Sequence, residues 1–122
     1  MAKFNSFEEI IAWQKARELN LELYLVTAQG NFSKDHGLRD QIRRASISIT
    51  SNIAEGFERE TTKEFIRFLY IAKASSGEFR SQLYLASDLN YISKDEFERL
   101  NLKVSEISKL IGGLIKYLKS TF

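Results

Sequence analysis

No proline occurs anywhere in the 122 residues of this chain. Proline ends or kinks a helix from within, and β-rich domains use proline and glycine at their many turns. With no proline and only six glycines, the sequence favours long, uninterrupted helices over a sheet. The length suits one domain, so residues 1–122 are predicted to form a single all-α domain.

Capping residues predict where these helices begin. A Ser or Thr followed three residues later by Glu can satisfy two backbone N–H groups reciprocally, which marks a helix start. Three such capping boxes precede apolar-periodic segments and mark the first, third and fourth helices. They are Ser6 with Glu9, Thr61 with Glu64, and Ser93 with Glu96.

Apolar residues spaced three and four apart give each predicted helix one buried face. The pattern is longest in the fourth helix, where it keeps a coiled-coil register over three heptads. Four such helices with short connections imply an antiparallel up-down-up-down four-helix bundle. The predicted core positions are Phe7, Ile10, Ile11, Ala12, Ala16, Leu19, Leu23 and Val26 in the first helix; Leu38, Ile42, Ala45, Ile49 and Ile53 in the second; Phe65, Phe68, Ala72, Ser75, Phe79, Leu83, Ala86 and Leu89 in the third; and Phe97, Leu100, Val104, Ile107, Ile111, Leu114 and Leu118 in the fourth.

The second helix, predicted from about Gly37 to Ala54, carries a competing signal. Its second half, ASISITSNIAEG, alternates apolar and small polar residues, and this alternation is also typical of a strand. We predict a helix because a single short strand would have no partner in this chain.

The predicted helices carry more apolar side chains than one internal core needs. Gly112 and Gly113 fall on positions facing away from the fourth-helix core, where each glycine costs about 1 kcal/mol relative to alanine. Close approach of another chain would account for both features and predicts a homo-oligomer. The alternative is that the extra apolar residues belong to a large internal core and that the two glycines only weaken the end of the fourth helix. The surplus apolar residues are Leu21, Tyr24, Leu25, Leu110, Ile115 and Tyr117.

Residues with catalytic or metal-binding chemistry are scarce. Cysteine is absent, no glycine-rich phosphate loop occurs, and the single histidine, His36, lies in a predicted solvated loop beside Asp35. Glu78 precedes the core residue Phe79, so a partly buried, paired carboxylate is expected there rather than a catalytic acid. The sequence therefore predicts no catalytic residue, metal, cofactor or enzymatic activity.

The N-terminal residues lack the apolar stretch of a signal peptide, and no segment approaches the length of a membrane span. These features predict a cytoplasmic protein without a membrane partner.

Basic residues at helical spacing are the remaining functional signal. Such residues can follow a phosphate backbone, which predicts contacts with nucleic acid that recognise shape rather than base. Alternatively, Asp40 neutralises Arg43 or Arg44 across one helical turn, and the lysines only confer solubility. The predicted nucleic-acid-binding residues are Arg39, Arg43 and Arg44 in the second helix, and Lys109, Lys116 and Lys119 in the fourth.

From about Phe7 to Leu118, the sequence resembles the four-helix-bundle proteins encoded within intervening sequences of 23S ribosomal RNA genes. The most specific matches are QIRRA at residues 41–45 and SNIAEG at 51–56. The family usually has proline where this chain has Thr50, which implies a straighter second helix or a kink of another cause. Further matches are Glu64-Phe65, Phe68-Leu69, Ser75, Glu78, Gln82-Leu83 and Leu89-Asn90-Tyr91-Ile92.

The resemblance implies a homopentamer and kinship with accessory variability proteins of retroelements, which bind nucleic acid and a reverse transcriptase. It also makes Arg43, Arg44, Asn52, Glu55 and Gly56 motif positions. We expect Asn52 and Glu55 to cap and brace the end of the second helix, and Gly56 to supply a left-handed turn. The predicted function is binding of structured RNA or DNA by a non-enzymatic oligomer, with a protein–protein adaptor or scaffold as the alternative.

Overall fold

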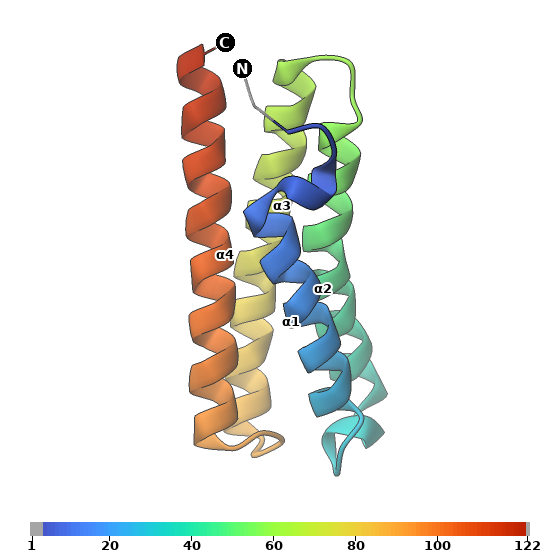
Figure 1. Cartoon of the computed structure of the whole chain (residues 1–122). Coiled ribbons are helices and arrows are strands. Elements are labelled where there is room, and N and C mark those ends of the chain that lie inside the picture. The colour runs from blue at the N-terminus through green and yellow to red at the C-terminus, as the bar shows by residue number, and fades with distance from the viewer. Residues whose placement is uncertain (1–3, 122) are drawn as a thin grey trace.

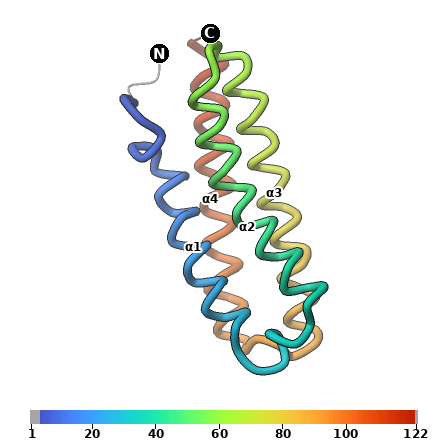
Figure 2. Tube along the Cα trace, turned by 90° about the vertical axis from the view of Figure 1, so that its right-hand side faces the viewer, coloured from blue at the N-terminus to red at the C-terminus, as the bar shows by residue number. Residues whose placement is uncertain are grey.

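The computed structural model describes residues 4–121, which form four long helices and two short 3-10 turns. Successive helices run in opposite directions, and α1 and α3 occupy opposite corners, each packed between α2 and α4 (Figures 1 and 2). The predicted four-helix fold is confirmed, and the alternating segment of the second helix is helical. The elements are η1 (Phe7–Glu9), α1 (Ile11–Thr27), η2 (Phe32–Lys34), α2 (His36–Phe57), α3 (Thr62–Asp88) and α4 (Lys94–Thr121).

The core follows most of the predicted apolar positions, although Phe7 and Phe97 are only half-buried and several other positions depart from the prediction. Ile11 is 51% exposed because it begins α1, and Leu89 is 45% exposed because it follows the end of α3. Ile115, predicted outside the fourth-helix seam, is buried, whereas Leu114 is only half-buried. A straight helix drifts by about 20° per heptad against a seven-residue repeat, so the buried line of α4 has moved toward Ile115 by its third heptad.

The predicted helix starts are correct for α3 and α4. Ser93 and Glu96 bond reciprocally, with the Ser93 N–H donating to Glu96 Oε1 at 2.8 Å and the Glu96 N–H donating to Ser93 Oγ at 3.0 Å. Thr61 Oγ1 accepts from the Glu64 N–H at 3.1 Å, while the Glu64 carboxylate pairs with Arg67. Both helices therefore begin where the sequence indicates.

The predicted start of the first helix at Ser6 is wrong. The Ser6 side chain makes no capping hydrogen bond, and Glu9 accepts instead from the Asn5 N–H at 3.1 Å. A 3-10 turn follows, and α1 begins only at Ile11 after the extended residue Ile10. Burial of Ile10, which is 2% exposed, holds the chain in this turn before the α-helix begins.

Asp35 links the α1–α2 connection to the α3–α4 connection at one end of the bundle. Its carboxylate caps α2 by accepting from the Leu38 N–H at 3.1 Å, and it also accepts from the Tyr91 hydroxyl at 2.9 Å. These two hydrogen bonds lower the pKa of Asp35. His36 is exposed as predicted, but it is the first residue of α2 rather than part of a loop.

Gly56 is a contact residue between helices, so the predicted left-handed turn is wrong. It lies within α2, where an added Cβ would be 2.6 Å from Phe68 Cβ and 3.1 Å from Phe65 Cδ1. Among the described residues, positive φ angles occur at Gly30 and Asn90. The glycine therefore lets α2 and α3 approach closely.

The other predicted motif residues also have different roles. Asn52 does not cap α2; its Nδ2 donates to the carbonyl and hydroxyl oxygens of Ser48 at 2.8 and 2.9 Å, one turn back in the same helix. Glu55 braces the helix end as expected, through a 2.8 Å ion pair with Arg59. Glu78, expected to be partly buried, is exposed, because its position on α3 points away from the core.

Hydrogen bonds and ion pairs connect α1 to both neighbouring helices, α2 and α4. Toward α2, Asn20 accepts from the Ser46 hydroxyl at 2.5 Å and donates to Thr50 Oγ1 at 3.1 Å. Toward α4, the Glu22 carboxylate pairs with Arg99 and with Lys103. These bonds hold the shortest of the four helices in register.

Glu22 makes the docking of α1 sensitive to acid. Burial acts to raise the pKa of this carboxyl, but hydrogen bonds from Lys103 and Arg99 outweigh it and hold the pKa below 4.5. A depressed folded pKa contributes stability above the unfolded pKa and loses it as the pH falls through the folded value. In urea unfolding at a series of pH values, we expect Glu22→Gln to be less stable than wild type near pH 7, with the difference shrinking below about pH 4.5. A difference that stayed constant with pH would contradict this role.

Candidate nucleic-acid interface

The arginines predicted to bind nucleic acid do not form one free surface. Arg39 Nη1 donates to the Ser33 carbonyl at 2.9 Å, and its Nε pairs with Asp40 at 3.0 Å. Arg44 is exposed and has no hydrogen bond or ion pair to any described residue. Asp40 therefore neutralises Arg39, whereas the sequence suggested Arg43 or Arg44 as its partner.

Arg43 is bound to the end of α1. Its Nε donates to Thr27 Oγ1 at 2.8 Å, its Nη2 donates to the Tyr24 carbonyl at 3.4 Å, and its guanidinium lies 4.2 Å from the Tyr24 ring centroid. A cation at a helix C-terminus satisfies free carbonyl groups and opposes the negative end of the helix dipole. Arg43 thus joins α2 to α1 structurally.

Arg43→Ala is therefore expected to lower the free energy of unfolding by about 1–3 kcal/mol, because it removes charged hydrogen bonds to partly buried groups. Arg44→Ala, the neighbouring change with the same loss of charge, should stay within about 0.5 kcal/mol of wild type. Chemical denaturation of both variants checks this difference. Equal losses in the two variants would show that Arg43 does not hold α1.

Two of the predicted lysines meet in a groove between α3 and α4. Lys116 and Lys119 line this groove, here called the α3–α4 groove, which has a volume of about 310 Å³. Lys109 lies apart, in a hollow on α4 that it shares with Glu106. The remaining lining residues of the groove are Tyr70, Lys73, Gly112 and Ile115.

The ammonium groups of the groove are anchored only by neutral partners. Lys73 Nζ donates to Ser108 Oγ at 3.2 Å, and Lys119 Nζ donates to the Tyr70 hydroxyl at 2.6 Å. Residues 65–77 of α3 and 107–121 of α4 include no acidic residue. Because no carboxylate lines the groove, its three positive charges remain available to an anion.

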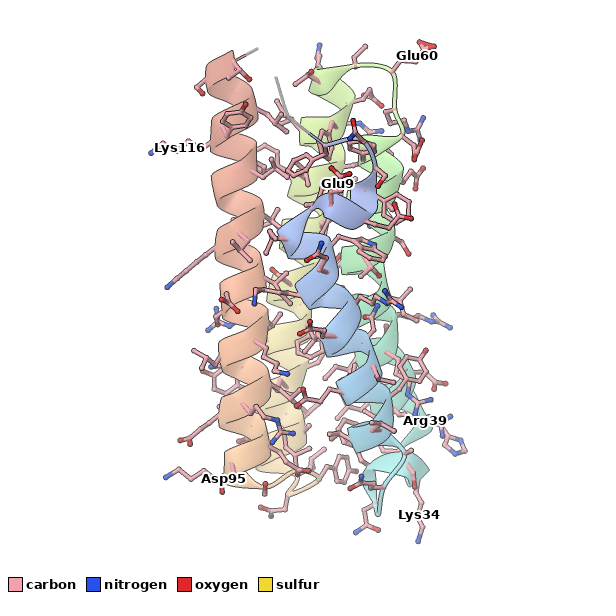
Figure 3. All side chains as sticks on the ribbon, in the orientation of Figure 1. Glu9, Lys34, Arg39, Glu60, Asp95 and Lys116 are labelled. Atoms are coloured by element: carbon pink, nitrogen blue, oxygen red, sulfur yellow. The ribbon has the colours of Figure 1, made fainter. Side chains whose placement is uncertain are left out.

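The arginine cluster and the lysines of the α3–α4 groove lie toward opposite ends of the bundle. Figure 3 shows Arg39 near the end formed by the α1–α2 and α3–α4 connections, and Lys116 toward the opposite end of the bundle on α4. A single bundle therefore presents two separate basic surfaces, of which the α3–α4 groove holds the greater concentration of unpaired charge.

The sequence profile of a family described as "23S rRNA-intervening sequence protein" matches residues 8–113. The chain belongs to this family. Its fold is similar to a crystal structure of a protein of unknown function from the S23 ribosomal protein family of Bacteroides thetaiotaomicron, with a TM-score of 0.81 and 29% sequence identity. That similarity covers 87% of this chain and 96% of the other. A comparison with curated proteins finds no match.

Within this 23S rRNA-intervening sequence protein, the described residues include no group of three His, Cys, Asp or Glu side chains placed to hold a metal ion. None of the helices formed by residues 4–121 is long and apolar enough to cross a membrane.

Sequence reasoning missed Lys73 and Tyr70. Both lie on α3: Lys73 is 43 residues before Lys116, and Tyr70 is 49 residues before Lys119. Periodicity places a residue on a helix face but leaves the register between two helices open. The available signal was compositional, namely the absence of acidic residues from residues 65–77 and 107–121.

Proposed function

We propose that this family member is a non-enzymatic module that binds structured RNA through phosphate contacts at the α3–α4 groove. The observation that carries the proposal is the convergence of Lys73, Lys116 and Lys119 from two helices without an acidic neighbour in the lining. Lysine binds phosphate as a point charge, and neutralising phosphates releases condensed counterions, which drives binding. Arg44, exposed and unpaired among the described residues, supplies a second contact at the other basic surface.

The proposed active form is a cytoplasmic homo-oligomer, a pentamer by the family resemblance. Support comes from large exposed apolar side chains, with Leu21 66%, Leu25 60% and Leu102 73% exposed. Leu21 and Leu25 lie one turn apart on α1, and adjoining exposed apolar side chains are typical of interaction sites. Repeating the groove in each subunit would also raise the overall affinity for a long RNA through multivalency. Light scattering coupled to size exclusion measures the mass; a monomer at micromolar concentration would contradict this part of the proposal.

A second candidate function is a protein–protein adaptor or scaffold, with a partner such as a reverse transcriptase. It is favoured by a hollow of about 370 Å³ on α1, lined in part by Trp13, Arg17 and Leu21. Tryptophan and arginine are the residue types that most often dominate the energy of protein interfaces. On this alternative, substitutions in the hollow affect partner binding and the lysines of the groove have no effect.

A fluorescence titration of structured RNA with the purified protein, at low and at physiological salt, tests the proposed function. We expect saturable binding whose logarithm falls linearly with the logarithm of the salt concentration, because phosphate contacts release counterions. No binding at low salt would overturn the RNA proposal and leave the adaptor function.

A further inference from the structure

The lining of the α3–α4 groove includes apolar side chains as well as lysines. The Tyr70 side chain, 46% exposed, and the buried Ile115 both line it together with the three lysines. A bare phosphate would use only the ammonium groups. The volume of about 310 Å³ lies at the lower end of the range for small-molecule sites, so the groove can hold a ligand with an apolar body.

Gly112 lines this groove without contributing a side chain to it. An added Cβ would lie 3.4 Å from Lys73 Cε, with no other contact within 4 Å apart from its own helix. The residue is inside α4 and has no left-handed backbone conformation, so the chain does not need glycine there for its geometry. Glycine inside a helix costs stability relative to alanine. Its useful effect at this position is free space beside Lys73.

We propose that the groove takes a single unpaired nucleotide, with its base on Tyr70 and its phosphate among the three lysines. This inference rests on the proposed function and names the chemistry of that same site. Aromatic side chains stack bases of any sequence, and lysines hold the adjoining phosphate. Lys119 Nζ lies 5.0 Å from the Tyr70 ring centroid, and its flexible stem lets it move to the phosphate when a base covers the ring.

A nucleotide site in the groove would determine which RNA the protein prefers. Bases in a duplex are already stacked and paired, so a duplex can offer this groove only its phosphates. An unpaired nucleotide in a loop, bulge or single strand offers the base as well. The protein is therefore expected to bind a single strand more tightly than a duplex of the same length at equal salt.

Gly112→Leu tests the nucleotide site because it adds an apolar side chain to the groove without removing any lysine from the sequence. Gly77→Leu is its control, since it makes the same change at an exposed position of α3 outside the groove lining, where an added Cβ meets nothing within 4 Å. The probes are a labelled oligouridine strand, an RNA duplex of equal length and adenosine monophosphate. We expect Gly112→Leu to weaken strand binding at least about fivefold, to the level of the duplex, while the salt dependence of binding stays as in wild type. Gly77→Leu should bind the strand as tightly as wild type does.

The outcomes separate this inference from the proposed function. If Gly112→Leu keeps wild-type affinity for the strand, the nucleotide site is wrong, while salt-dependent binding would still support phosphate contacts. If wild type binds no RNA at low salt, the proposed function fails as well. Adenosine monophosphate binding that Gly112→Leu abolishes would assign the groove to free nucleotides; loss of strand binding alone would assign it to an unpaired nucleotide of RNA. Thermal melting of both variants confirms that they are folded.

Discussion

Replacing Gly56 with alanine is expected to lower the free energy of unfolding by at least about 2 kcal/mol, because one added methyl group overfills the α2–α3 contact. Its Cβ would lie 2.6 Å from Phe68 Cβ and 3.3 Å from the Phe65 carbonyl oxygen, and neither atom is at the far end of a flexible side chain. Helices α2 and α3 must therefore move apart. At roughly 4 °C per kcal/mol for a domain of this size, the melting temperature should fall by about 8 °C or more.

Gly77→Ala is the control for Gly56→Ala because it makes the same change inside a helix. Gly77 is exposed in α3, and an added Cβ meets nothing within 4 Å. Alanine there should stabilise the protein by about 0.5–1 kcal/mol, since it restricts the unfolded chain and favours the helix. Differential scanning calorimetry of both variants gives the comparison. A Gly56→Ala variant as stable as wild type would show that the close approach of the helices is not required.

The role of Gly56 could not be predicted from the sequence. Its place in the motif and near a helix end suggested a left-handed turn, because glycine is common there. Glycine is required because Phe68, twelve residues later, leaves no room for a Cβ at residue 56. This contact depends on how closely α2 and α3 pack. The apolar spacing that predicted α2 and α3 fixes which faces meet and leaves the distance between them open.

The basic residues illustrate the same limit at the candidate interface. The sequence placed Arg43 on a helix face, but its role depends on the position of the α1 end, which supplies Thr27 and the Tyr24 carbonyl as partners. Lys116 and Lys119 were found from their own spacing. Lys73 joins them only once α3 and α4 are packed in register. Helix identity and burial are properties of local sequence, whereas a binding site formed by two helices depends on their packing.

Removing two of the groove lysines should produce the largest change in RNA binding. The double variant Lys73→Gln/Lys116→Gln keeps the size of both side chains nearly unchanged and removes two of the three charges of the groove. If each lysine contacts one phosphate, the slope of log affinity against log salt should decrease by about 0.7 per contact for single-stranded RNA. Affinity at low salt should fall by at least about tenfold, because charged hydrogen bonds are lost at both positions.

The control for this variant is Lys34→Gln/Lys94→Gln, which gives the same net charge at the opposite end of the bundle. Figure 3 shows Lys34 and Asp95, the neighbour of Lys94, at that end. Long-range attraction depends on net charge and would weaken equally in both double variants, whereas phosphate contacts depend on position. A loss of affinity and of salt dependence confined to the groove variant would therefore assign the contacts to the α3–α4 groove. Equal losses would reduce the groove to one part of a diffuse positive field, and the proposed site would be wrong.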